Sequence, residues 1–148
     1  MKSFPIFISC VTVAVFLYAV INGPARASAP AGRYTISDGV VNDKKTRLAW
    51  QRNAAPNALT WDEAESYCKT LDLAGGGWRL PSIKELHTLV DETRWDPAID
   101  DSAFPGTPSD SFWAWPKEPN GAAPICYFGQ GMSTMIAATT PAYVRCVR

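Results

Sequence analysis

The sequence predicts an α+β domain in which two helices flank small antiparallel sheets and a long irregular loop. Three observations predict this class. Short strand-like segments lie at both ends of the chain, two segments with helix-start signals lie between them, and a proline-rich, aromatic-rich stretch follows the second helix. A chain of 148 residues with 47% apolar residues suffices for one such domain and a leader.

The N-terminal residues 1–27 have the pattern of a secretory signal peptide. Lys2 precedes an almost wholly apolar run from Phe4 to Ile21, and Ala25-Arg26-Ala27 is typical of a cleavage site. We therefore expect a secreted, periplasmic or cell-surface protein with no membrane insertion after cleavage. An uncleaved anchor is the alternative, because the run approaches the length that spans a bilayer. The remaining chain divides into a short lead-in, residues 28–32, and a single domain, residues 33–148.

The first strands are predicted from turn residues that lie between apolar segments. Arg33 to Ile36 and Val40-Val41 flank the turn Ser37-Asp38-Gly39. Thr46 to Gln51 follows the polar tip Asn42-Asp43-Lys44-Lys45, so a hairpin is expected there.

Two helices are indicated by capping-box patterns at Thr60-Trp61-Asp62-Glu63 and Ser82-Ile83-Lys84-Glu85. Helical spacing predicts a buried stripe on the first helix, formed by Ala64, Tyr67, Cys68 and Leu71. The second helix is expected to end near Asp91 and to bury Ile83, Leu86, Leu89 and Val90.

A long loop is predicted from Glu92 to Pro124, with a short strand at Phe112 to Trp115. Three further strands are expected to close the domain: Ile125 to Phe128, Met132 to Ala137, and Tyr143 to Arg148.

Several motifs together resemble those of the Lcl C-terminal domain family. They are Asp43-x-x-Thr46-x-Leu48-x-Trp50-Gln51, Thr60-Trp61-x-x-Ala64-x-x-Tyr67-Cys68, Trp78-Arg79-Leu80-Pro81-Ser82-x-x-Glu85-Leu86, Phe104-Pro105, and Tyr143-Val144-Arg145-Cys146-Val147-Arg148. The family is named after the C-terminal domain of a bacterial collagen-like adhesin, and it is distantly similar to C-type lectin-like and formylglycine-generating enzyme folds. The resemblance implies a C-type lectin-like fold and adhesin-like, non-enzymatic recognition of extracellular glycan or a surface protein.

Removal of the leader leaves Cys68, Cys126 and Cys146, and an oxidising compartment favours one disulfide. The resemblance implies a bridge between Cys68 in the first helix and Cys146 in the last strand, as in lectin-like domains. Pairing of Cys126 with Cys146 is the alternative, because both lie on expected neighbouring strands. With the first pairing, Cys126 is expected as a buried free thiol or, alternatively, as an intermolecular link.

Two sets of oxygen-bearing side chains are candidates for Ca²⁺. Glu118-Pro119-Asn120 resembles the triplet that supplies oxygens to Ca²⁺ in sugar-binding C-type lectins, but the later Trp-Asn-Asp triplet of those lectins is absent. An exposed turn is therefore the alternative for Glu118 and Asn120. The second set includes Asp96, Asp100 and Asp101, for which the alternative is turn chemistry in a solvated loop.

Aromatic and charged residues give two more candidates. Trp113 and Trp115 alternate, so on a strand they share one face and form a platform for a sugar; the alternative is that they fill the core. The motif residues Trp78, Arg79, Pro81 and Glu85 are expected to be structural, with Arg79 pairing with Glu85 or loop carbonyls. A ligand role for Arg79 and Glu85 is the alternative.

Composition and motifs also exclude some functions. The 14 basic and 14 acidic residues cancel, which argues against a nucleic-acid partner. The single histidine, His87, and the absence of hydrolase or zinc-protease motifs give little support to an enzyme. The alternatives to a binding module are a secreted enzyme of the formylglycine-generating type, with Cys126 as the thiol, and an envelope domain that binds a protein. Without a collagen-like repeat, multivalent binding would require a homo-oligomer.

Overall fold

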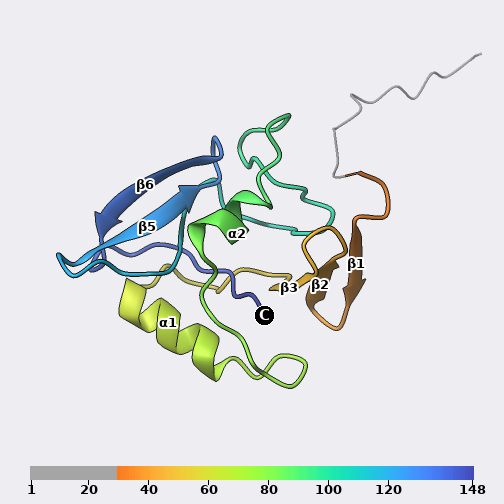
Figure 1. Ribbon diagram of the computed structural model, residues 1–148. Helices are drawn as coiled ribbons and strands as arrows, with labels where there is room; N and C mark the ends of the chain where they lie inside the picture. Colours follow the sequence, from red (N-terminus) through yellow and green to blue (C-terminus); the bar gives the residue numbers. More distant parts are fainter. Residues whose placement is uncertain (1–29) are drawn as a thin grey trace, which may run out of the picture.

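The computed structural model describes residues 30–148, so the predicted signal peptide lies outside the described residues (Figure 1). The first sheet contains β1 (Tyr34–Ser37), β2 (Val40–Asp43) and β3 (Leu48–Gln51), in the order β1-β2-β3. The second sheet contains β4 (Ser111–Trp113), β5 (Ala122–Tyr127) and β6 (Met132–Ala137), in the order β4-β5-β6. All pairs within both sheets are antiparallel. Between the sheets in sequence lie α1 (Trp61–Thr70) and α2 (Ile83–His87), which confirms the α+β class.

The turns of the first sheet follow from local side-chain chemistry. Asp38 and Gly39 both have positive φ, at 49° and 78°, which fits a two-residue turn between β1 and β2. At the β2–β3 tip, the buried carboxylate of Asp43 accepts hydrogen bonds from Lys45 N at 2.9 Å and from Thr46 Oγ1 at 3.0 Å. Arg33 pairs with the same carboxylate at 2.6 Å, so a partly buried ion pair closes the hairpin tip.

Both helices begin at the predicted capping boxes. Glu63 accepts from the Thr60 amide at 2.9 Å, and Glu85 accepts from the Ser82 amide at 2.8 Å. On α1, Ala64 and Cys68 are completely buried, as the stripe predicts. The second helix is shorter than predicted and ends at His87, because the amides that follow it bond three residues back rather than four.

The second sheet agrees with the prediction in part. The predicted strand at residues 112–115 ends at Trp113, β5 begins at Ala122 within the expected loop, and β6 occupies the predicted residues. The remaining loop between α2 and β4 carries Ile99 and Phe104, both completely buried. These apolar side chains anchor the loop in the core.

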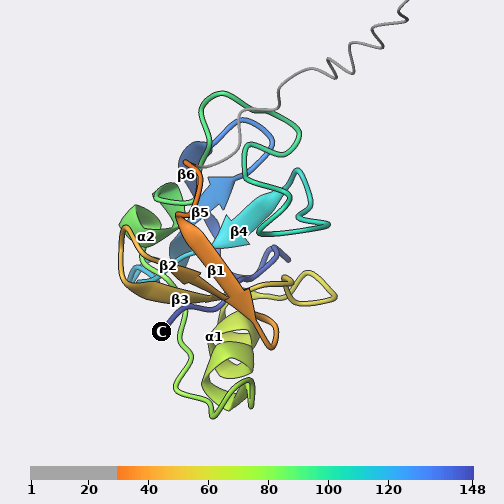
Figure 2. The ribbon, with the colours of Figure 1, turned by 90° about the vertical axis from the view of Figure 1, so that its right-hand side faces the viewer.

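The prediction of a regular last strand at residues 143–148 is wrong. These residues instead form an extended segment that contacts both sheets. Residues 143–148, here called the C-terminal segment, form only isolated bridges: to Trp50 and Arg79 from Val147, and to Phe112 from Tyr143. The segment runs along β3 on one side and reaches β4 on the other (Figures 1 and 2). Because its neighbours change along its length, it has no single partner strand.

A disulfide fixes the C-terminal segment to α1. Cys68 and Cys146 are bonded across 78 positions of sequence, which confirms the pairing implied by the family resemblance. Cys126 is a free, buried thiol. No helix within residues 30–148 is long and apolar enough to cross a membrane.

Candidate functional site

The charged pair of the Trp-Arg-Leu-Pro motif is held at the surface by the buried C-terminal segment. The backbone of Arg79 exchanges two hydrogen bonds with Val147, each 3.0 Å long. Its guanidinium donates to both carboxylate oxygens of Glu85, at 2.9 and 2.7 Å. The hydrogen bond from Arg79 lowers the pKa of Glu85 to about 2, and the amide and hydroxyl of Ser82 act in the same direction. Glu85 is therefore a fixed anion at neutral pH, and Arg79 is its oriented partner.

An exposed tryptophan stands beside this pair. The amide of Trp115 donates to Pro81 O at 2.8 Å, so the backbone after β4 is tied to the residue that precedes α2. The side chain of Trp115 remains 54% exposed. It lines a cleft of about 430 Å³, here called the Trp115 pocket, together with Glu65, Lys69, Arg79, Leu80, Ser82 and Glu85.

The charges of the Trp115 pocket are matched within it. Lys69 pairs with Glu65 at 2.9 Å on one turn of α1, and Arg79 pairs with Glu85. The pocket thus combines one apolar ring face with paired charges that can still accept or donate hydrogen bonds to a ligand. This combination suits an uncharged, hydroxyl-rich molecule with an apolar face.

The predicted platform of Trp113 and Trp115 is wrong. Trp113 is completely buried, and its indole donates to Leu59 O at 2.7 Å, whereas Trp115 is exposed. The strand ends between the two residues, so their alternation does not place both rings on an accessible face. Of the two, only Trp115 can meet a ligand.

Two other residues of the Trp-Arg-Leu-Pro motif, Trp78 and Pro81, are buried next to the pocket. Trp78 is buried and its indole donates to Leu73 O at 2.7 Å, which holds the loop after α1. Pro81 is buried and its carbonyl accepts from Trp115. These two residues position the Trp115 pocket rather than line it.

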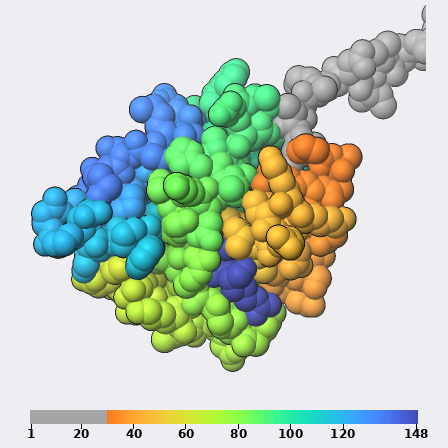
Figure 3. Space-filling model, viewed as in Figure 1, coloured from red at the N-terminus to blue at the C-terminus, as the bar shows by residue number. Residues whose placement is uncertain are grey.

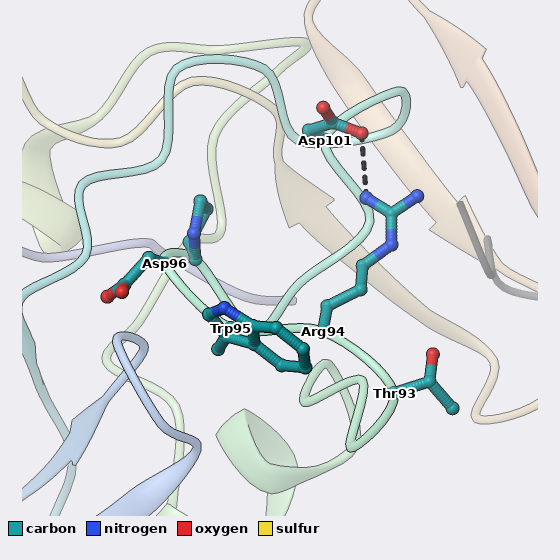
Figure 4. Close-up of a pocket in the computed structure, with 6 residues that line it drawn as sticks. Thr93, Arg94, Trp95, Asp96 and Asp101 are labelled. Carbon is teal, nitrogen blue, oxygen red and sulfur yellow. Dashed lines mark hydrogen bonds and ion pairs between the residues drawn. The ribbon is translucent and has the colours of Figure 1, made fainter. Parts of the chain in front are cut away.

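A second pocket surrounds Trp95, which the sequence interpretation did not single out. Trp95 is 76% exposed and lines a cavity of about 320 Å³, here called the Trp95 pocket, with Thr93, Arg94, Asp96, Pro97 and Asp101. Figure 4 shows its indole beside Arg94, whose guanidinium pairs with Asp101 at 2.8 Å. The loop is fixed because the amide of Asp96 donates to Gly129 O at 3.0 Å.

The candidate calcium ligands do not assemble. Asp96 points away from Asp101, and Asp101 is paired with Arg94 (Figure 4). Asp100 caps its own turn by accepting from the Ser102 amide. Across residues 30–148, no three His, Cys, Asp or Glu side chains converge on a metal position. These residues do not fit a Ca²⁺ site, which needs several converging oxygens.

The lectin-like triplet forms a turn. Asn120 Oδ1 accepts from the Ala122 amide at 2.9 Å, and Gly121 N donates to Glu118 O at 3.0 Å. The triplet residues are exposed. This agrees with the alternative interpretation, in which Glu118 and Asn120 belong to an exposed turn.

The thiol of Cys126 and the imidazole of His87 both lie near Ser133. Cys126 lies opposite Ser133 in the β5–β6 register, and Ser133 Oγ contacts Nε2 of His87. Burial raises the pKa of the Cys126 thiol to about 11. A thiol that is completely buried and protonated at neutral pH is not a nucleophile.

Sequence comparison identifies the family of the chain. A family model described as the Lcl C-terminal domain matches residues 39–148. The chain belongs to the Lcl C-terminal domain family. Within this Lcl C-terminal domain, the match includes every residue of both tryptophan pockets and both cysteines of the disulfide. Comparison with curated protein sequences gives no significant match.

Proposed function

We propose that this protein is a secreted or cell-envelope binding module that recognises an uncharged extracellular glycan through the Trp115 pocket, without catalysis. The observation that carries the proposal is the exposed indole of Trp115, held by the backbone beside the Arg79–Glu85 pair. An exposed tryptophan in a cleft is costly to keep in water and is a typical contact surface for an amphipathic ligand.

The chemistry of the pocket favours a sugar over other ligand classes. The apolar face of a pyranose ring can stack on the indole, while its hydroxyls bond to the carboxylate and guanidinium edges. The paired charges of the pocket provide no net charge to attract an ion. The ligand is therefore a neutral sugar rather than an acidic or a basic one.

The Trp95 pocket repeats the same combination on another loop. There too an exposed indole lies next to an arginine–carboxylate pair, Arg94–Asp101. We propose that it provides a secondary contact for the same polysaccharide, because two stacking rings on one rigid domain increase retention of a repeating ligand.

We further propose that the fold is C-type lectin-like. Three features support this: the disulfide from the first helix to the last segment, the pairing of β3 with the C-terminal segment, and the long loop that precedes β4. The proposed mode of binding is not that of a calcium lectin, because the candidate Ca²⁺ ligands within residues 30–148 do not converge.

The alternatives have weaker support. An enzyme of the formylglycine-generating type needs an accessible thiol, and Cys126 is completely buried with a raised pKa. Binding of a surface protein remains a competing proposal for the same exposed tryptophans. The extracellular location rests on the predicted signal peptide of residues 1–27.

The test is binding of the purified protein to immobilised neutral polysaccharides, with glucans, mannans and galactans compared with sulfated and uronic-acid polymers. We expect binding to at least one neutral polymer that changes little between about 0.05 and 0.5 M NaCl. Trp115→Ala should weaken it at least about tenfold, which corresponds to about 1.4 kcal/mol.

The matched control is Trp95→Ala, which removes an exposed indole of the secondary pocket and should weaken binding less. Preferred binding to the acidic polymers, or an undiminished affinity in Trp115→Ala, would contradict the proposal. A protein captured at the Trp115 pocket, with no polysaccharide bound, would favour the protein-binding alternative.

A further inference from the structure

The outer side of β6 is an unpaired sheet edge. In the second sheet β6 pairs with β5 alone. The hydrogen bond from Ala138 N to Gly121 O shows which residues of β6 direct their backbone N–H and C=O groups towards β5. Because bonding direction alternates along an antiparallel strand, Ser133, Met135 and Ala137 direct their backbone groups away from β5. Within residues 30–148, the only backbone bond from another segment to these groups is from Thr140 N to Ala137 O.

Two of the other sheet edges are covered by the C-terminal segment. On the outer side of β3, Ala49 exchanges hydrogen bonds of 2.8 and 2.9 Å with Arg148. On the outer side of β4, Tyr143 receives one bond from Trp113 and donates another to Ser111, each 2.9 Å long. The C-terminal segment thus provides hydrogen-bond partners for the outer edges of β3 and β4, whereas within residues 30–148 no segment does so for β6 beyond the single bond from Thr140 N.

The remaining edge, β1, differs from β6 in length and in charge. It has four residues and is bounded by Arg33 and Asp38. By contrast, no charged residue occurs from Pro119 to Val144, and β6 itself contains no proline. Natural edge strands are normally protected from pairing by charges, prolines or bulges. β6 has none of these protections.

The exposed side chains of β6 carry no charge, and two of them are methionines. Met132 is 60% and Met135 45% exposed, and Figure 3 shows this part of the chain, coloured blue, at the margin of the molecule. Beside them a pocket of about 290 Å³ is lined by side chains from β5 and β6 that include Ile125 and Ile136. An uncharged, methionine-bearing edge fits a partner strand that is itself uncharged.

We propose that β6 pairs with the β6 of a second copy of this chain, antiparallel about a two-fold axis at Met135. Met135 then lies opposite the partner's Met135, and Ser133 lies opposite the partner's Ala137. Their outward backbone groups bond to each other, and the two three-stranded sheets join into one. A second copy is favoured because each strand then covers the edge of the other, closing the assembly.

This pairing does not depend on the carbohydrate proposal, but it would affect it. A dimer carries two Trp115 pockets on one rigid body, which raises the avidity for a repeating polymer without a new contact. Failure of glycan binding would leave the pairing intact, and failure of the pairing would leave a monovalent binder.

The first test is sedimentation equilibrium of the purified protein at concentrations from about 1 to about 200 µM. We expect a dimer in this range and a dissociation constant raised at least about tenfold by Met135→Lys, since the two ammonium groups face each other across the axis. The matched control is Ile36→Lys, which introduces the same charge on β1 at a side chain that is also 45% exposed. It should leave the dimer unchanged.

A second test fixes the register. Directly opposed residues in a hydrogen-bonded antiparallel pair lie about 5.5 Å apart at Cα, within reach of a disulfide. Met135→Cys should therefore give a covalent dimer on oxidation with copper–phenanthroline, and Thr134→Cys should not. A monomer at every concentration, or loss of the dimer in Ile36→Lys but not in Met135→Lys, would overturn the proposal.

Discussion

The C-terminal segment and β6 have opposite relations between sequence and environment. The C-terminal segment contains two arginines, yet Arg145 is completely buried. β6 contains no charged residue, yet Met132 is 60% exposed. In this fold, therefore, the position of a segment between the sheets or at an edge decides its burial more than its own polarity does.

Burial of a cation requires specific acceptors, and the fold supplies them to both terminal nitrogens of Arg145, whereas its Nε has no hydrogen-bond partner within the described residues. The guanidinium of Arg145 donates to the carbonyls of Gln51, at 2.8 Å, and Arg52, and to the hydroxyl of Thr107 at 2.7 Å. Its Cζ lies 4.7 Å from the ring centre of Phe104, a favourable cation–π contact. Burial lowers the pKa of Arg145 to about 9, so the side chain is still charged at neutral pH.

The largest effect is expected at this buried cation. Arg145→Ala leaves two backbone carbonyls without their donor and opens a cavity between Phe104 and the end of β3, which should cost about 3–5 kcal/mol. The measurement is the urea dependence of unfolding. If Arg145→Ala does not fold, Arg145→Lys can be measured instead. It keeps the positive charge but loses the planar guanidinium with its several donors, so its stability should lie between those of the natural protein and Arg145→Ala.

The control is the exposed arginine of the same segment. Arg148 donates to Ala74 O and Gly76 O, each at 2.8 Å, but its side chain is solvated. Arg148→Ala should therefore cost only about 1 kcal/mol. Equal losses for the two variants would contradict the claim that burial distinguishes the two arginines.

A smaller effect is expected from loss of the disulfide that fixes the C-terminal segment to α1. Replacing Cys68 and Cys146 together with serine removes a cross-link over 78 positions and should lower the free energy of unfolding by about 2–4 kcal/mol. Thermal unfolding with and without dithiothreitol measures it. Reductant should lower the midpoint of the natural protein and leave that of the double variant unchanged; a shift in both would point to Cys126.

Features set by short-range chemistry were predictable from the sequence. The starts of α1 and α2 follow from the Thr60–Glu63 and Ser82–Glu85 patterns, and β6 occupies its predicted residues. The end of α2 was not predictable, because Leu89 is buried in a turn just as it would be in a helix. The apolar pattern is the same in both cases.

Features set by contacts between distant segments were not predictable. The alternation of residues 143–148 indicates an extended chain, but nothing in it reveals partners on two sides. The contrast between Trp113 and Trp115 depends on where β4 ends against Pro81. Trp95 gave one usable signal, a large aromatic residue among charged neighbours in a loop, which the interpretation did not use.

The smallest effect is expected at the Arg79–Glu85 pair on the surface. Its contribution to stability should depend on pH, whereas that of the buried Arg145 should not. The pKa of Glu85 is lowered to about 2 by Arg79, so the folded state gains stability from the ionised carboxylate above its ordinary pKa of 4.5. That stability is lost as the pH falls from about 4.5 towards 2, and solvent screening of the half-exposed Arg79 limits it to about 1 kcal/mol.

The measurement compares the natural protein with Glu85→Gln in urea at neutral pH and near pH 2. Glu85→Gln should be less stable at neutral pH, and the difference should disappear in acid, where the carboxyl is protonated. The loss caused by Arg145→Ala should persist at both pH values, because its guanidinium donates to carbonyls and a hydroxyl, which do not titrate. A difference for Glu85→Gln that stays constant with pH would mean that the side chain acts through packing rather than charge.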